Sequence, residues 1–116
     1  MTENEFQQQI IDYAHSNGWR IFHAQTSRIQ RKDGSVYYAT AGIADSKGFP
    51  DLILLRGAQI VVVEVKAEKG RLSPEQCEWL AAWDMTEADM YVWRPSDWPE
   101  IERRLRRRVD IEKALG

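Results

Sequence analysis

The sequence predicts an α/β fold in which helices flank a mixed β-sheet on both faces. Segments with apolar residues at helical spacing alternate along the chain with short runs of β-branched residues. The two central runs, residues 51–56 and 59–66, are apolar on both faces, which is typical of strands that helices cover on each side. The chain has 116 residues and no internal repeat, so we expect residues 1–116 to form a single domain with one core.

The first predicted element is a helix over residues 3–17. Phe6, Ile10 and Ala14 recur at steps of four, which places them on one helical face. Gly18 follows directly, in the position where a glycine often ends a helix. We therefore expect this helix to pack its apolar face on the sheet.

The next segment predicts a strand and then a long loop. Residues 19–25 alternate well enough for a strand that places His23 on the same face as Trp19, and so in the core. Residues 26–47 are polar and contain glycine, so we expect a loop with one short strand at 36–39. A loop of this length in a small domain is more often functional than idle.

The centre of the chain predicts a β-hairpin. Residues 51–56 and 59–66 are rich in the aliphatic and β-branched residues that favour strands. Gly57-Ala58 between them suits a tight turn, so the two strands pair in antiparallel orientation.

The second half of the chain predicts a helix, a strand and a further helix. Ser73-Pro74-Glu75-Gln76 begins the first of these helices, because serine and glutamine three residues apart form a capping box and proline suits the first turn. Cys77 follows as a buried helix residue. Residues 90–93 form the last strand, and a basic helix covers residues 97–110.

The composition excludes several classes of protein. Hydrophobic residues make up 43% and charged residues 29% of the chain, which is ordinary for a globular domain and not for a disordered one. Cys77 is the one cysteine, so a disulfide scaffold is excluded, and no apolar run approaches the ~20 residues of a membrane span. Residues 1–5 are polar and acidic, unlike a secretory signal, so we expect a cytoplasmic protein.

Charge is distributed unevenly along the chain. The formal net charge of −2 argues at first against a nucleic-acid binder, but residues 1–100 carry −5 and residues 101–116 carry +3. The arginines of this basic end are Arg103, Arg104, Arg106, Arg107 and Arg108. Two interpretations are a solvated helix face and a surface that contacts phosphates, and the run alone favours the solvated face.

The hairpin register places two carboxylates side by side. With the turn at residues 57–58, Asp51 lies opposite Glu64, and facing Cβ atoms are roughly 4.5–5.5 Å apart. Lys66 shares the face of Glu64, two residues away. Paired carboxylates resist joint ionisation, and a divalent cation such as Mg²⁺ or Mn²⁺ removes the conflict. We favour such a site over the alternative in which Asp51 only begins a strand and Glu64 pairs with Lys66.

A third carboxylate is expected from the first helix. Glu3 is in phase with the apolar stripe that contains Phe6 and Ile10, whereas Glu5 is in phase with the polar stripe. We therefore expect Glu3 to face the sheet. The Glu-x-Glu spacing leaves Glu5 as the alternative.

The order of these motifs resembles that of a known nuclease family. Gly48-Phe49-Pro50-Asp51, followed thirteen residues later by Glu64-Val65-Lys66, is similar to the PD-(D/E)xK nuclease signature. The helix glutamate and the segment Gly70-Arg71-Leu72-Ser73-Pro74-Glu75-Gln76 extend the resemblance to the VRR-NUC family within that superfamily. The similarity runs from Glu3 to about Trp93.

This resemblance implies a restriction-endonuclease-like three-layer sandwich and a Mg²⁺- or Mn²⁺-dependent DNA endonuclease. The site residues that it implies are the metal ligands Asp51, Glu64 and Val65 (backbone carbonyl), Glu3 through a water, the catalytic lysine Lys66 and the supporting glutamine Gln76. Single-domain members of the family occur in phages and bacteria, form homodimers and are associated with cutting four-way junctions. The resemblance therefore implies a structure-selective homodimer that acts on branched or double-stranded DNA in a bacterial or phage-infected cell.

Basic residues near the motifs are the expected contacts to DNA. They lie in the loop 26–47 and after the Glu-x-Lys strand, and are Arg28, Arg31, Lys32, Lys47, Lys69 and Arg71. Two other functions stay open, a non-catalytic DNA-binding module and an assembly domain whose basic segment 103–108 binds an acidic partner. The non-catalytic module is less favoured, because a site that has lost catalysis tends to lose charges that are costly to bury, and this chain keeps Asp51, Glu64 and Lys66.

Overall fold

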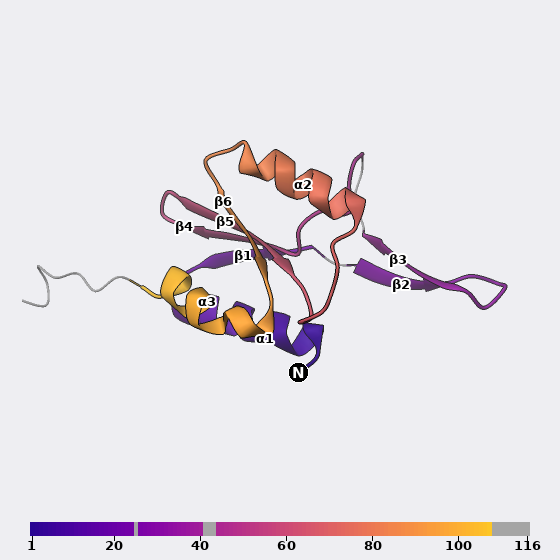
Figure 1. The fold of residues 1–116 in the computed structure, drawn as a ribbon, viewed down its shortest axis with the longest axis horizontal. Coiled ribbons are helices and arrows are strands. Elements are labelled where there is room, and N and C mark those ends of the chain that lie inside the picture. Colours follow the sequence, from indigo (N-terminus) through magenta and orange to yellow (C-terminus); the bar gives the residue numbers. More distant parts are fainter. Residues whose placement is uncertain (25, 41–43, 108–116) are drawn as a thin grey trace, which may run out of the picture.

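A central β-sheet with helices on both faces makes up the fold (Figure 1). The computed structural model describes residues 1–24, 26–40 and 44–107. In chain order the elements are α1 (Glu3–Ser16), β1 (Arg20–His23), β2 (Thr26–Gln30), β3 (Val36–Thr40), β4 (Leu52–Arg56), β5 (Gln59–Val65), α2 (Pro74–Asp84), β6 (Asp89–Trp93), the 3-10 helix η1 (Pro95–Asp97) and α3 (Trp98–Leu105). None of the helices in these ranges is long and apolar enough to cross a membrane. The predicted α/β class is confirmed, and the arrangement is compatible with a restriction-endonuclease-like fold.

The central sheet is mixed, as predicted. Its strand order is β1-β4-β5-β6, with antiparallel pairing from β1 to β5 and a parallel pair between β5 and β6. Leu52 pairs with Val63 and Arg56 with Gln59, so the predicted hairpin register is confirmed. A parallel pair needs a crossover connection, and the segment that contains α2 supplies it.

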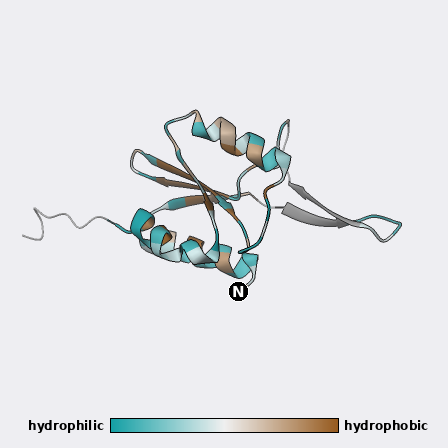
Figure 2. Ribbon diagram, viewed as in Figure 1, coloured by the Kyte–Doolittle hydropathy of each residue, from teal (hydrophilic) through white to brown (hydrophobic). Residues whose placement is uncertain are grey.

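The core lies between the sheet and the layer formed by α1 and α3. Phe6 and Ile10 of α1 pack with Val61 and Val63 of β5 and with Ile101 of α3, and all five side chains are fully buried. Figure 2 shows the hydrophobic strands in the middle of the molecule and hydrophilic residues along the helices that cover them. The apolar stripe of α1 thus anchors this helix against the strand that carries Glu64.

The opposite face of the sheet carries α2 and some exposed apolar residues. Leu80 is the buried residue of α2, which packs on β6. Phe22, Leu55 and Ile60 share a sheet face with the buried Val62, yet they are 61%, 44% and 38% exposed. This face therefore offers an apolar surface around β1 and β4 that α2 does not cover.

The segment predicted as a loop contains a β-hairpin. β2 and β3 pair in antiparallel register, with Thr26 opposite Thr40, and the hairpin extends away from the rest of the molecule (Figure 1). The prediction of one short strand at 36–39 was therefore incomplete. The missed strand, Thr26–Gln30, lacks the alternation of apolar and polar residues by which strands are recognised.

Three smaller predictions are wrong. The C-terminal helix ends at Leu105 and not near residue 110, because Arg106 has an extended backbone (φ −61°, ψ 144°); residues 108–110 lie outside the described part. His23 is exposed, because it ends the edge strand β1. Cys77 is exposed as well, because α2 buries Leu80 against the sheet and leaves the Cys77 side chain in solvent.

Candidate functional site

The candidate site lies at the open end of the β4–β5 hairpin. Asp51 directly precedes β4, and continuing the register by one pair sets it opposite Glu64. The Asp51 Oδ2 atom accepts a hydrogen bond of 2.8 Å from the backbone N–H of Val65. This bond fixes the Asp51 carboxylate beside the strand that carries Glu64.

Glu64 is a buried carboxylate, with a relative exposure of 2%. Its Oε1 atom accepts a hydrogen bond of 3.0 Å from Gln76 Nε2 and lies 4.0 Å from the ammonium nitrogen of Lys66. Its other oxygen, Oε2, is buried and has no hydrogen-bond partner among the described residues. A buried carboxylate oxygen without a partner is costly, so Oε2 is the atom that a cation in this site would satisfy.

The electrostatics of the site disfavour an ionised Glu64. Burial is the largest cause that raises the pKa of Glu64 from 4.5 to about 9, and the charge of the neighbouring Asp51 adds to the rise. Lys66 opposes this rise in pKa, and the charge of Glu3 contributes to it. In the metal-free protein, Glu64 therefore holds its proton at neutral pH.

This raised pKa predicts how the stability of the metal-free protein depends on pH. Below pH 4.5 both the folded and the unfolded chain hold the Glu64 proton, and the contribution of this carboxyl group to the free energy of unfolding is fully present. Between pH 4.5 and about 9 only the folded chain holds the proton. The free energy of unfolding therefore falls as pH rises through this window, by up to about 1.4 kcal/mol per pH unit. Urea unfolding with EDTA measures the slope. The Glu64→Gln variant does not titrate here and should show a flatter profile; equal profiles would contradict the prediction.

The two glutamates at the start of α1 have different surroundings. Thr2 is the N-cap of α1, and the backbone N–H of Glu5 donates to its hydroxyl oxygen at 3.1 Å. That hydroxyl in turn donates to Glu5 Oε1 at 3.1 Å, so the Glu5 side chain belongs to the helix cap. Glu3, in contrast, acts on the pKa of Glu64. This arrangement favours Glu3 over Glu5 as the helix carboxylate of the site.

Gln76 joins the start of α2 to the site. The Ser73 hydroxyl accepts from the Gln76 backbone N–H at 3.1 Å, and Gln76 Oε1 accepts from the Ser73 backbone N–H at 2.8 Å, which completes the predicted capping box. Because the amide oxygen is engaged in the cap, the amide nitrogen faces Glu64 Oε1. The helix cap therefore sets the orientation of the buried carboxylate.

The Gln76→Glu substitution separates these two roles. A glutamate still offers an oxygen to the Ser73 N–H and keeps the cap, but it replaces the donor to Glu64 with a second acceptor. We expect little loss of thermal stability and a decrease of about 10–100-fold in the affinity for divalent metal. Metal titration of the wild type and the variant measures the change. Unaltered affinity would show that Gln76 serves the helix alone.

Gly48 brings the segment before Asp51 into contact with the start of α2. Its φ of +81° lies in the left-handed region, and a Cβ there would come within 2.6 Å of the Glu75 carbonyl carbon and 2.7 Å of the Gln76 nitrogen. Sequence reasoning used Gly48 as part of a motif and missed this close approach. The glycine before Phe49-Pro50 is the one signal that the sequence offers for it.

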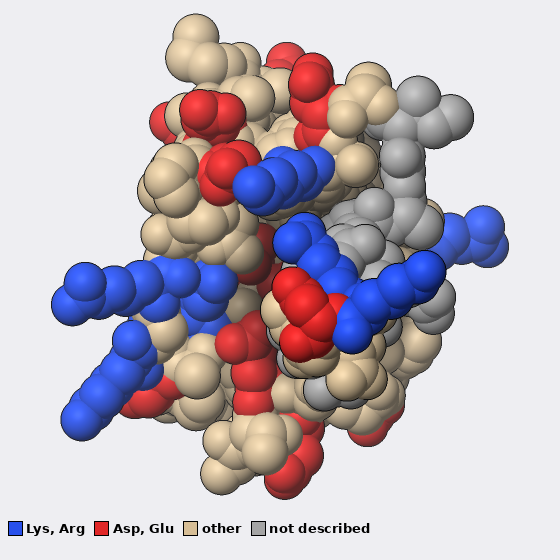
Figure 3. All heavy atoms as spheres, turned by 90° about the vertical axis from the view of Figure 1, so that its right-hand side faces the viewer, with Lys and Arg blue, Asp and Glu red and all other residues tan. Residues whose placement is uncertain are grey.

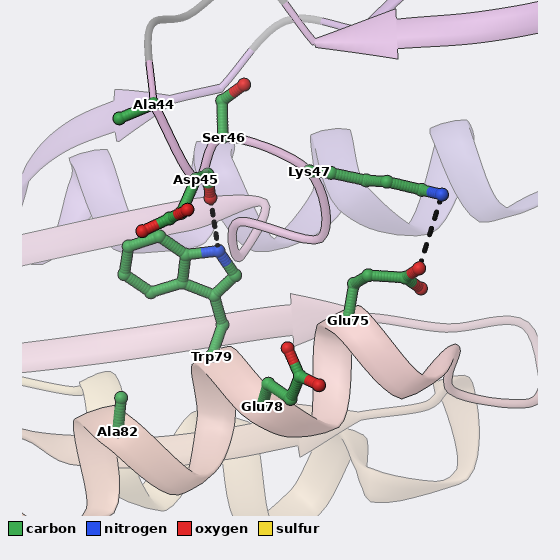
Figure 4. Close-up of a pocket in the computed structure, with 8 residues that line it drawn as sticks. All are labelled: Ala44, Asp45, Ser46, Lys47, Glu75, Glu78, Trp79 and Ala82. Carbon is green, nitrogen blue, oxygen red and sulfur yellow. Dashed lines mark hydrogen bonds and ion pairs between the residues drawn. The ribbon is translucent and has the colours of Figure 1, made fainter.

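The loop before Asp51 also packs on α2 around a pocket of about 490 Å³ (Figure 4). Trp79 donates its indole N–H to the Asp45 carbonyl at 2.8 Å, and its ring meets Phe49 edge to face at 5.0 Å between centroids. Lys47 forms an ion pair with Glu75 at 3.2 Å on the same side. The contacts of Trp79 hold the Gly-x-Pro-Asp segment on α2.

The predicted DNA-contacting residues lie on several different elements. Lys69 and Arg71 are exposed in the segment after β5, Arg31 and Lys32 lie at the end of the β2–β3 hairpin, and Lys47 pairs with Glu75. The Arg28 side chain lies outside the described part. Figure 3 looks onto this end of the molecule, where acidic side chains run down the middle and basic side chains flank them. This pattern suits a cation at the centre and phosphates around it.

The donor set fits a hard divalent cation bound by two carboxylates. Within residues 1–24, 26–40 and 44–107, no group of three His, Cys, Asp or Glu side chains has the geometry of a metal site. The pair Asp51 and Glu64 nevertheless meets the chemical requirement, because a cation relieves their repulsion and satisfies Glu64 Oε2. Glu3 adds its charge to the electrostatics of this pair.

Comparison with known proteins supports the resemblance seen in the sequence. The family model of the VRR-NUC domain matches residues 43–97, which include the Gly-x-Pro-Asp segment, the Glu-x-Lys strand and α2. The predicted resemblance to the VRR-NUC family is confirmed. The curated proteins give no match. The solved structures give none either.

Proposed function

We propose that the chain is a metal-dependent DNA endonuclease, because residues 43–97 match the model of the VRR-NUC domain, a nuclease domain of DNA processing. The observation that carries the proposal is the buried Glu64, which shares the hairpin end with Asp51 and Lys66 and keeps one oxygen without a partner. Buried like charges beside an ammonium are common at sites that bind a metal and a phosphate. The proposed place of action is the cytoplasm of a bacterium or a phage-infected cell.

Asp51 and Glu64, with the backbone carbonyl of Val65, are the proposed ligands of Mg²⁺ or Mn²⁺. When bound, such a cation lowers the pKa of a coordinated water and offsets charge on the scissile phosphate. Val65 N–H holds Asp51 Oδ2, and Gln76 holds Glu64 Oε1, so both carboxylates are oriented before the substrate arrives. Glu3 is the proposed partner of a coordinated water.

Lys66 is the proposed catalytic cation of the chain itself. Its side chain is 13% exposed and its ammonium stays near Glu64, where it can orient the attacking water and offset charge that grows on the phosphate oxygens. The water oxygen bonds to phosphorus, the bond to the leaving oxygen breaks, and the products are a phosphate end and a hydroxyl end. The water's proton passes to solvent or to the leaving oxygen.

The basic residues around the site are proposed to hold the DNA backbone. Lys69 and Arg71 lie three and five residues after Lys66 in the chain, and the β2–β3 hairpin projects from the same end of the molecule (Figure 1). Contacts to phosphates position DNA without reading its sequence. Selectivity for branched DNA is therefore proposed to come from shape.

We also propose a homodimer, which would place two sites on symmetric strands. The exposed apolar residues Phe22, Leu55 and Ile60 on one sheet face support it. Sedimentation velocity of the wild type and of Phe22→Glu tests the proposal. A dimer that dissociates in the variant supports this face, and a wild-type monomer at all concentrations contradicts the dimer.

A cleavage panel tests the proposed activity. Linear, flap, fork and four-way-junction DNA are incubated with the protein and Mg²⁺, Mn²⁺ or EDTA. We expect cleavage with either metal, none with EDTA, and the highest rate on a branched substrate. Binding of these DNAs without cleavage at micromolar protein would contradict the proposal and favour the non-catalytic module.

A further inference from the structure

A second charged pocket lies at the end of the sheet opposite the candidate site. It has a volume of about 670 Å³, and it is lined by Arg56, Gln59, Asp89, Arg103, Arg104 and Arg106. These residues come from the β4–β5 turn, the start of β6 and the end of α3, which meet at the left of Figure 1. We call this group of six residues the arginine pocket.

Two arginines of the pocket are fixed by the fold. Arg56 donates to the Asn17 and Leu105 carbonyls at 3.0 Å and lies over the Trp19 ring, 4.3 Å from its centroid. These contacts fix the position of the Arg56 guanidinium at the wall of the pocket.

Arg104 is held more tightly. It pairs with Asp89 at 2.7 Å and donates to Gln59 Oε1 and to the Tyr91 hydroxyl, both at 3.1 Å. Its charge is balanced by Asp89, which is the one carboxylate among the described residues that line the pocket. Asp89 is therefore already paired with Arg104.

Arg103 and Arg106 complete the pocket as exposed side chains. In the part of the chain that the structure describes, neither side chain takes part in an ion pair or a hydrogen bond. Among the described residues, Arg103 and Arg106 therefore bring two unpaired positive charges to the pocket, in a protein whose formal net charge is −2. The contacts of these two side chains give them no structural role.

The position of the pocket determines which DNA it can meet. Arg56 and Gln59 flank the hairpin turn, whereas Asp51 and Glu64 lie at the open end of the same hairpin. Five residues of strand separate Asp51 from the turn, a span of roughly 17 Å. A phosphate held in the arginine pocket is therefore not one of those beside the cleaved bond.

We infer that the arginine pocket binds the phosphate backbone of a second segment of DNA, apart from the segment at the catalytic site. Guanidiniums suit phosphate oxygens because they present paired donors, and prepositioned arginines lose little freedom on binding. The inference rests on the proposed function, since an enzyme that acts on branched DNA meets two segments at once. Of the two interpretations of the C-terminal arginines, the phosphate-contacting surface then applies to Arg103 and Arg106. Arg56 and Arg104 belong to the same surface.

The test measures DNA binding by the cleavage-deficient Asp51→Asn protein as a function of salt. The variant pair is Arg103→Ala/Arg106→Ala, and the matched control is Arg103→Lys/Arg106→Lys, which keeps the charge. The probes are a duplex of about 8 base pairs, roughly 27 Å long, and a four-way junction with longer arms. Fluorescence anisotropy gives the affinities, and thermal unfolding confirms that each variant is folded.

For the junction, the alanine pair is expected to reduce the slope of log K against log salt by about 2, and the lysine pair to leave it near the wild-type value. For the short duplex, all three proteins are expected to bind alike. An unchanged slope on the junction would overturn the inference and leave the pocket to an acidic protein segment. An equal reduction of the slope on both DNAs would overturn the inference too, because a single short segment would then contact both the arginine pocket and the catalytic site. Cleavage of the short duplex by the wild type tests the proposed function separately, since that activity does not need the pocket.

Discussion

Replacing Asp51 with asparagine is expected to abolish DNA cleavage while the protein stays folded. An asparagine Oδ1 atom can still accept the 2.8 Å hydrogen bond from the Val65 N–H, so the hairpin end keeps its geometry. The charge that holds the cation is lost, and we expect the cleavage rate to fall by on the order of 10³-fold. A cleavage assay with Mg²⁺ measures the rate, and thermal unfolding reports the fold. Because the variant also removes repulsion from Glu64, we expect its stability to equal or exceed that of the wild type.

Lys66→Ala is expected to give a loss of similar size for a different reason. The Lys66 ammonium lies 4.0 Å from Glu64 Oε1, and its proposed role is to act on the phosphate rather than on the metal. Metal binding should therefore persist while cleavage is lost. Asp84→Asn, at an exposed carboxylate that ends α2, is the control for a charge change away from the site. Wild-type cleavage by Asp51→Asn or Lys66→Ala would contradict the assignment.

Gly48→Ala is expected to damage both the fold and the site. At a φ of +81° an alanine costs about 1–3 kcal/mol in backbone strain, and its Cβ would collide with the backbone of Glu75 and Gln76. The start of α2 must then move, and Gln76 moves with it away from Glu64. We expect a lower urea midpoint and at least about a 10-fold loss of cleavage at temperatures where the variant is folded.

Gly57→Ala is the matched control for this substitution. Gly57 also has a positive φ, +59°, but no atom lies within 4 Å of an added Cβ. The control therefore has the conformational cost without the collision, and it should cleave a short duplex at the wild-type rate. If Gly48→Ala and Gly57→Ala lost the same stability and the same activity, contact with α2 would not be the cause.

The core of the site could be predicted from the sequence because a tight turn determines the register of a hairpin. Once Gly57-Ala58 is the turn, no other pairing keeps both apolar strands aligned, and Asp51 must face Glu64. The Ser73–Gln76 capping box was predictable for a similar reason, since it depends on residues three apart. Local rules of this kind need no knowledge of the tertiary structure.

Features that depend on tertiary contacts were not predictable. His23 looked like a core residue by alternation, but it ends an edge strand, where its Nε2 atom lies 2.8 Å from Gln7 Nε2 in solvent. The choice between Glu3 and Glu5 as the helix carboxylate depends on the cap that Thr2 forms and on how α1 approaches the sheet. Helical phase favoured Glu3 and left Glu5 open, because both lie in the first turn.

The arginine pocket also depends on tertiary contacts and was not predictable from the sequence. The run of arginines near the C-terminus is by itself consistent with a solvated helix face. Arg56 joins Arg104 only because the β4–β5 turn returns to the end of α3, where Trp19 and Arg56 both donate to the Leu105 carbonyl. No spacing along the chain indicates that these distant residues meet.

Calorimetric titration of Mn²⁺ into the metal-free protein at neutral pH tests the paired-carboxylate site most directly. Glu64 holds a proton below about pH 9, so a cation that binds Asp51 and Glu64 must displace it. Titrations in two buffers with different ionisation enthalpies count the protons released. We predict saturable binding to the wild type with release of about one proton per ion, and no binding to Asp51→Asn. A wild type that binds no metal, or an Asp51→Asn protein that binds it equally well, would contradict this account.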